Sequence, residues 1–88
     1  MISNQILQNT IDGLKGITRT DLCVFDIEGK ILAATFSEAD EYIKPAKNFV
    51  ESPADSQVVS GSQFFKVFDE RQLEYVLLVK GETEEIYM

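Results

Sequence analysis

Between residues 56 and 80, apolar side chains recur on average at about every second position. A period of two is typical of β-strands, so this segment predicts two long antiparallel strands. The polar residues 69–72 between them predict the turn. The opposed pairs in this register are Phe68 with Leu73, Lys66 with Tyr75, and Phe64 with Leu77.

Both faces of this predicted hairpin are apolar, because successive side chains point to opposite sides of a strand. A small antiparallel sheet usually leaves one face to water. Two apolar faces therefore require a cover on each side, and the covering elements are where we expect function. One face holds Phe64, Phe68, Leu73, Tyr75, Leu77 and Val79, and the other holds Phe65, Val67, Val76 and Leu78.

A helical spacing of apolar residues predicts an N-terminal helix over residues 3 to about 15. Ser3 is suited to cap its start and Gly16 to end it. Its apolar stripe consists of Ile6, Leu7, Ile11 and Leu14.

Two β-rich runs within residues 22–36 flank the segment from Asp26 to Gly29. Gly29 can adopt positive φ, and the Asp26 carboxylate can accept backbone N–H bonds across a turn. This segment predicts a β-hairpin.

Short helices are predicted between the two hairpins. Ser37 can cap a first helix, Pro45 interrupts it and favours the start of a second, and Pro53 ends the second. The resulting order, with strands on both sides of a helical crossover, predicts an α+β fold with an antiparallel sheet. PAS-like and profilin-like domains have this element order.

The chain has 88 residues, which predicts a single domain, and its formal net charge of −7 disfavours binding to nucleic acid or to an anionic membrane. It lacks an apolar run near the roughly 20 residues of a membrane helix, and we expect a cytoplasmic protein. Cys23, the single cysteine, is expected to pack in the core. With no histidine and no acid–base or nucleophile motif, we expect neither an enzyme nor a metal or cofactor site.

Thr83 followed by Glu84 and Glu85 resembles the start of a helix, with a capping residue before acidic side chains. Because the sequence stops shortly afterwards, at Met88, we expect the chain to be cut from a longer protein.

Residues 21–35, with the Asp26–Ile31 turn at their centre, resemble the first hairpin of PAS-type sensor domains. After an N-terminal helix, this segment is similar to the N-terminal domain of bacterial transcriptional regulators of the sugar-diacid and purine-catabolism type. The resemblance implies a homodimeric sensory domain that binds a small metabolite and relays the signal to a C-terminal helix-turn-helix domain.

Four polar residues are the candidate ligand-binding residues, in a pocket between the sheet and the short helices: Lys66, Tyr75, Ser60 and Tyr42. Lys66 in the register above could anchor an anionic metabolite beside the Tyr75 hydroxyl. The commoner use of such a residue is that of an edge-strand lysine that prevents aggregation. The segment from Ser60 through Gly61 interrupts the strand pattern and indicates a bulge or a close approach by ligand or backbone.

A second function is compatible with the same pattern. The chain could be a ligand-free dimerisation or protein-docking module, with the N-terminal helix covering the outer sheet face across a two-fold axis. A pocket with converging polar groups would favour sensing, and a filled core would favour docking.

Overall fold

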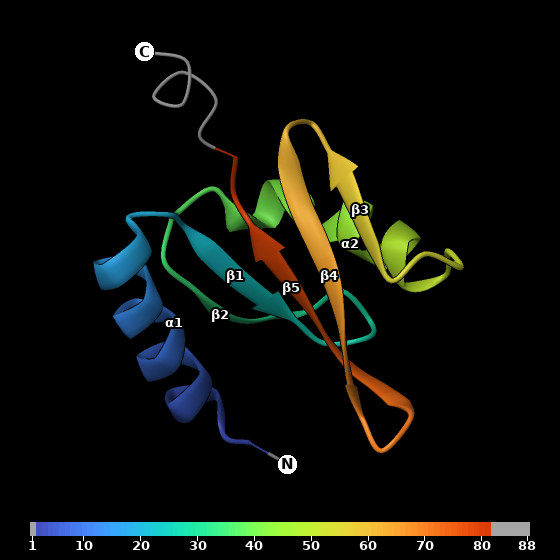
Figure 1. The fold of residues 1–88 in the computed structure, drawn as a ribbon, viewed down its shortest axis with the longest axis horizontal. Coiled ribbons are helices and arrows are strands. Elements are labelled where there is room, and N and C mark those ends of the chain that lie inside the picture. Colours follow the sequence, from blue (N-terminus) through green and yellow to red (C-terminus); the bar gives the residue numbers. More distant parts are fainter. Residues whose placement is uncertain (1, 82–88) are drawn as a thin grey trace.

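Five antiparallel strands in the order β2-β1-β5-β4-β3 form a sheet with helices on both faces (Figure 1). The computed structural model describes residues 2–81. The predicted α+β fold with an antiparallel sheet is confirmed. The elements are α1 (Asn4–Thr18), β1 (Leu22–Phe25), β2 (Ile31–Ala34), the 3₁₀ helix η1 (Ala39–Tyr42), α2 (Ile43–Val50), β3 (Ser56–Val59), β4 (Ser62–Asp69) and β5 (Gln72–Val79).

Helix α1 begins where the sequence predicts, because the Ser3 hydroxyl accepts the backbone N–H of Ile6 at 3.2 Å. The predicted end at Gly16 is wrong. The helix continues to Thr18, and Arg19 closes it in a left-handed conformation with φ of 59°. Its backbone N–H bonds the carbonyl of Lys15, so a non-glycine residue provides the C-terminal cap.

The first hairpin is confirmed. Strands β1 and β2 pair antiparallel, and Gly29 has φ of 88° in the turn between them. One carboxylate oxygen of Asp26 accepts the backbone N–H groups of Glu28 and Lys30, at 2.8 and 2.9 Å. These bonds fix the turn in the way that the sequence predicts.

The short helices differ in detail from the prediction. Ser37 does not cap η1; its hydroxyl bonds the Glu38 carboxylate, and η1 has no side-chain cap. Helix α2 starts two residues before Pro45, so the proline lies in its first turn. The backbone nitrogens of the first turn have no hydrogen-bond partner within the helix, and a proline there therefore destabilises the helix little. As predicted, α2 ends before Pro53.

The C-terminal segment forms three strands, so the prediction of two long strands is wrong. Ser60 and Gly61 have φ of 53° and 81° and join β3 to β4 as a two-residue hairpin loop. Positive φ at both loop positions matches the right-handed twist of the paired strands. The sequence pattern at Ser60 and Gly61 indicated a bulge. The structure has a tight turn there instead, after which β4 runs antiparallel to β3.

The predicted pair of Phe68 with Leu73 is present, but the register beyond it is wrong. An irregularity between Val67 and Phe68 shifts the pairing by one residue. Lys66 consequently pairs with Val76, and it lies on the opposite face of the sheet from Tyr75. The same shift pairs Phe64 with Leu78, Phe65 with Leu77 and Val67 with Tyr75.

Each face of the sheet carries its own buried cluster, as the two apolar faces require. The cluster under η1 and α2 contains Cys23, Phe25, Ala39, Ala46, Phe49, Phe64, Val76 and Leu78. The cluster under α1 contains Ile11, Leu22, Val24 and Ala33. The short helices cover one side, as expected, and the N-terminal helix covers the other side over β1 and β2. The helix start predicted at Thr83 lies outside the described residues.

Candidate functional site

Aromatic rings fill the layer between the sheet and the short helices. Phe49 of α2 and Phe64 of β4 have ring centroids 5.8 Å apart and are both almost fully buried. Tyr42 of η1 lies at the margin of this layer, 6.0 Å from Phe36 and 6.3 Å from Phe64. Tyr42 therefore packs against other rings at the place where we expected it to face a ligand.

Lys66 enters the same layer and is held there by protein groups. Its ammonium donates a hydrogen bond to the carbonyl oxygen of Ser52, just beyond the end of α2. The same nitrogen lies 5.2 Å from the ring centroid of Phe49. A cation at a helix C-terminus and over an aromatic face is stabilised by both. Lys66 therefore links β4 to α2 through this hydrogen bond and this cation–π contact.

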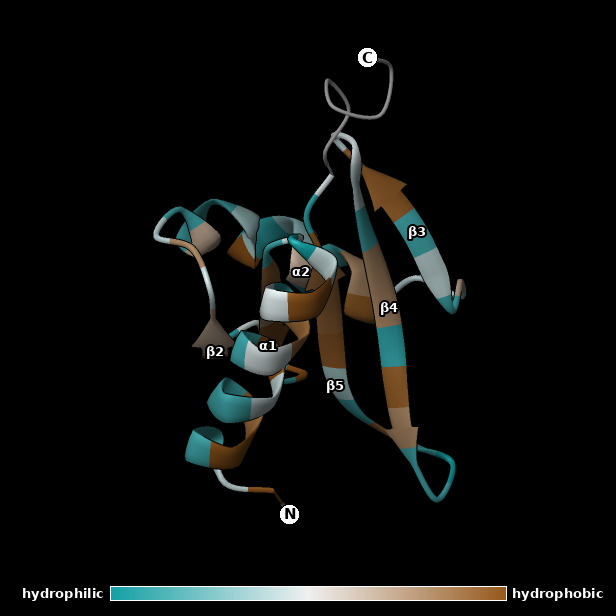
Figure 2. Ribbon diagram, turned by 60° about the vertical axis from the view of Figure 1, so that its left-hand side comes forward, coloured by the Kyte–Doolittle hydropathy of each residue, from teal (hydrophilic) through white to brown (hydrophobic). Residues whose placement is uncertain are grey.

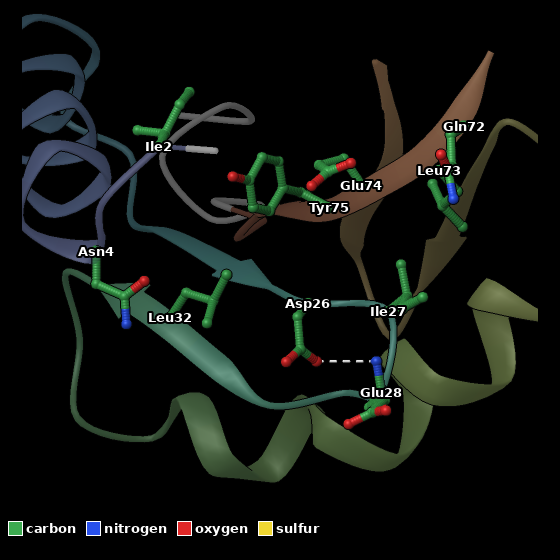
Figure 3. Close-up of a pocket in the computed structure, with 10 residues that line it drawn as sticks. All are labelled: Ile2, Asn4, Asp26, Ile27, Glu28, Leu32, Gln72, Leu73, Glu74 and Tyr75. Carbon is green, nitrogen blue, oxygen red and sulfur yellow. Dashed lines mark hydrogen bonds between the residues drawn. The ribbon is translucent and has the colours of Figure 1, made fainter. Parts of the chain in front are cut away.

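Tyr75 lies on the other side of the sheet, beside a shallow groove of about 390 Å³ near the start of α1. Figure 3 shows its hydroxyl directed toward Ile2, with Asp26 and Glu28 farther along the groove. The lining also includes Asn4, Ile27, Leu32, Gln72, Leu73 and Glu74. Its charged members are three carboxylates, so the groove repels the anionic metabolite that we expected Tyr75 to help bind.

The four predicted ligand residues do not converge. Lys66 and Tyr42 lie on the α2 side of the sheet, and Tyr75 lies on the α1 side. Ser60 is exposed in the β3–β4 turn. The structure therefore gives these residues three separate locations.

A more extensive feature than the groove is an exposed apolar surface on the α1 side, which the sequence did not lead us to expect. Phe65 and Val67 of β4 are 38% and 39% exposed, and Val58 of β3 is 63% exposed. All three point to the α1 side, since Phe65 pairs with Leu77 and Val67 with Tyr75. Figure 1 shows why they are uncovered: α1 lies beside β1 and β2, away from β3 and β4.

Helix α1 contributes the second part of this surface. The side-chain amide of Gln8 makes two hydrogen bonds to the backbone of Ala34 in β2, at 2.8 and 3.1 Å. Gln8 and Leu14 are three residues before and after the buried Ile11, so they lie on opposite flanks of the helix. The flank with Leu14 therefore turns toward β5 and β4, and it also carries Ile6 and Ile17.

We call these six residues the open face: Ile6, Leu14, Ile17, Val58, Phe65 and Val67. Ile17 is 81% exposed, and together the six expose apolar surface on the order of 500 Å², near the upper end for one patch on a monomer. The half-buried Leu77 lies between the helix and the strand parts, next to Phe65. Figure 2 shows hydrophobic segments on both α1 and β4.

The open face carries no charge although the whole chain has a formal net charge of −7. The neighbouring strand residues Ser56 and Gln63 are neutral, and so are Thr10 and Gly13 on the helix flank. Charge begins at one end of the open face, where Asp69 of β4 and Glu74 of β5 line a groove with Val67. An exposed apolar surface on an acidic protein is a candidate site of contact with another molecule. The sequence signal was present in Ile6 and Leu14, whose helical stripe was expected to cover the outer sheet face.

Among residues 2–81, two ionisable side chains have shifted pKa values. Burial raises the pKa of the Cys23 thiol to about 12, so Cys23 is a packing residue, as predicted, and stays a thiol at neutral pH. The hydrogen bond from Lys15 lowers the pKa of Asp21 below its ordinary value, with a further contribution from Thr35. Asp21 joins α1 to the strands, because Lys15 lies 2.6 Å and the Thr35 hydroxyl 2.9 Å from one of its oxygens.

Within residues 2–81 there is no cluster of three metal-ligating side chains. Over the same residues, no helix has the length and apolarity to cross a membrane. Comparisons with protein-family models, with curated proteins and with solved structures find no match to this chain.

Proposed function

We propose that this chain is a protein-interaction module, with a binding rather than a catalytic role, and that the open face is its docking surface. The observation that carries the proposal is the exposed pair Phe65 and Val67, which belongs to an apolar surface on the α1 side of the sheet. A monomer that kept this surface in water would lose the hydrophobic stabilisation of burying it, about 25 cal/mol for each Å².

The filled layer under α2 supports docking over sensing. A small-molecule site is a concave pocket with a few converging polar groups. The space between the sheet and the short helices holds Phe25, Phe49 and Phe64 instead, each at most 1% exposed. Lys66, the cation that would anchor an anionic metabolite there, is engaged with Ser52 and Phe49.

A photo-crosslinking residue at position 67 tests the docking role. In cells that express the chain, a benzophenone side chain in place of Val67 is expected to capture a protein, because it lies within the docking surface. The same group in place of the exposed Asn48 of α2, on the opposite side of the sheet, is the matched control and should capture far less. Equal or absent capture from both positions would contradict the proposal.

The groove beside Tyr75 supports a second candidate, a sensory domain of a bacterial transcriptional regulator. With Asp26, Glu28 and Glu74 in its lining, it favours a neutral or cationic metabolite over a sugar diacid. Thermal unfolding in the presence of metabolites tests this candidate. A rise in Tm with a cationic compound that disappears in Tyr75→Phe would favour sensing, and unchanged Tm values across the panel would remove it.

A further inference from the structure

The uncovered part of the α1 side has room for one more helix. Helix α1 packs on β1 and β2, and side chains of β5 pack against the same buried cluster, so β4 and β3 are the strands that continue uncovered beyond it. Neighbouring strands are about 4.8 Å apart, so two strands occupy a width of about 10 Å. A helix with its side chains is also about 10 Å wide. The open part of the sheet therefore matches the width of a single helix.

The open face contains the two surfaces that such a contact needs, one on a helix and one on the sheet. Its helix part, Ile6, Leu14 and Ile17, is an apolar ridge, and its strand part, Val58, Phe65 and Val67, is the uncovered sheet beside it. A two-fold axis brings each ridge onto the strand part of the other molecule, so one surface is complementary to itself.

We propose that the docking partner at the open face is a second copy of this chain, with α1 of each protomer packed over β3 and β4 of the other. This assignment rests on the proposed docking role of the open face. The formal net charge of −7 on each protomer opposes self-association, so a second copy can approach closely only where few charges meet, as at the six apolar residues of the open face. The same charge disfavours an anionic membrane or a nucleic acid at this face.

The area available also suits a homodimer. An interface of standard size buries about 800 Å² on each partner, with an apolar centre and a polar rim. The six residues of the open face provide apolar surface on the order of 500 Å². Neutral polar neighbours such as Thr10, Ser56 and Gln63 extend this centre on both the helix and the strands.

Sedimentation equilibrium of the full chain tests the association. We expect a monomer–dimer equilibrium, and we expect Ile17→Lys and Val67→Lys each to raise the dimer Kd at least tenfold, since each places a charge inside the contact. Ile17 is 81% exposed, so its substitution leaves the fold of the protomer intact. Asn48→Lys makes the same charge change on the α2 side and should leave the Kd unchanged.

A disulfide test reports the arrangement itself. A chain with Ile17→Cys mixed with a chain with Val67→Cys is expected to form a mixed disulfide dimer under mild oxidation. Pairing Ile17→Cys with Asn48→Cys is the control and should yield little of that product; Cys23 is buried in both.

Two outcomes separate this inference from the docking role. If the chain is a monomer at all concentrations and position 67 crosslinks to a different protein, the proposal that the partner is a second copy is overturned. The docking role of the open face is then supported. A dimer whose Kd is unaffected by Ile17→Lys and Val67→Lys, with no capture of any protein from position 67, would overturn both.

Discussion

Lys66 illustrates how a residue that looks functional in the sequence can be accounted for by packing. Its position inside an apolar strand suggested an anion anchor or an edge lysine. The irregularity in the β4–β5 pairing, where Glu74 of β5 is the extra residue, places Lys66 instead on the α2 side of the sheet. There its ammonium lies against the Ser52 carbonyl and the Phe49 ring. Alternation in the sequence could not reveal this, because one extra residue at a bulge exchanges the two faces.

We expect Lys66→Met to lower the free energy of unfolding by about 1–2 kcal/mol, since it removes a charged hydrogen bond and a cation–π contact but keeps the aliphatic stem. Chemical denaturation of the two proteins measures the difference. Lys44→Met, at an exposed position of α2, is the control and should change stability by less than about 0.5 kcal/mol. Equal effects of the two substitutions would show that the contacts of Lys66 contribute nothing.

Asp21 is the residue whose ionisation affects stability most directly. Lys15 and Thr35 lower its pKa in the folded state, so the folded chain favours the carboxylate more than the unfolded chain does. The stabilisation is therefore complete above the unfolded pKa of about 3.9 and is lost as the pH falls through the lower folded value.

We expect Asp21→Asn to destabilise the protein by about 1 kcal/mol at pH 7, and the difference from the parent chain to disappear toward pH 2. Unfolding free energies measured from pH 7 to pH 2 test this. Glu41→Gln, at an exposed position of η1, serves as the control for loss of one negative charge. A difference that stays constant with pH would mean that the carboxylate charge of Asp21 is not what stabilises the fold.

At the scale of the elements, two tight turns determine how the three C-terminal strands pair. The β4–β5 turn has positive φ at both central residues, Glu70 at 52° and Arg71 at 72°. Such turns normally use asparagine and glycine, so this one holds two residues in a conformation that costs roughly 1 kcal/mol or more each. The sequence predicted the place of this turn from its polarity but not its strain.

We expect Arg71→Gly to raise the free energy of unfolding by about 1 kcal/mol, because glycine adopts positive φ without steric cost. That change corresponds to an increase in Tm of roughly 4–8 °C for a domain of this size. Arg71→Lys keeps the backbone strain and should leave Tm unchanged. If Arg71→Gly lowers Tm, the turn is not under the strain that its φ values imply.

The remaining elements show which signals the sequence carried. Ser3, Asp26 and Gly29 act through local hydrogen bonds and φ preferences, so their elements were predictable. Ser60 and Gly61 gave an equally local signal, but the apolar run on both sides made a single strand the simpler interpretation. The apolar residues Ile6 and Leu14 were visible in the sequence, but their exposure was not predictable, since a helical stripe does not tell which part of a sheet the helix covers.

At the scale of the whole molecule, the two sides of the sheet are unequal. On one side η1 and α2 pack over a fully buried aromatic layer. On the other side α1 covers β1 and β2 and leaves the strand part of the open face in water. The fold explains why the candidate surface for function is an apolar face and not the pocket that the sequence suggested.

The most direct test of this account is oxidative footprinting of Phe65 in living cells, compared with the purified chain at high dilution. We predict that Phe65 is oxidised several-fold less in cells, where the open face is covered, whereas Ile27 in the β1–β2 turn reacts equally in both settings and serves as the internal reference. Equal oxidation of Phe65 in cells and at high dilution would show that the open face remains in water, and would contradict the account.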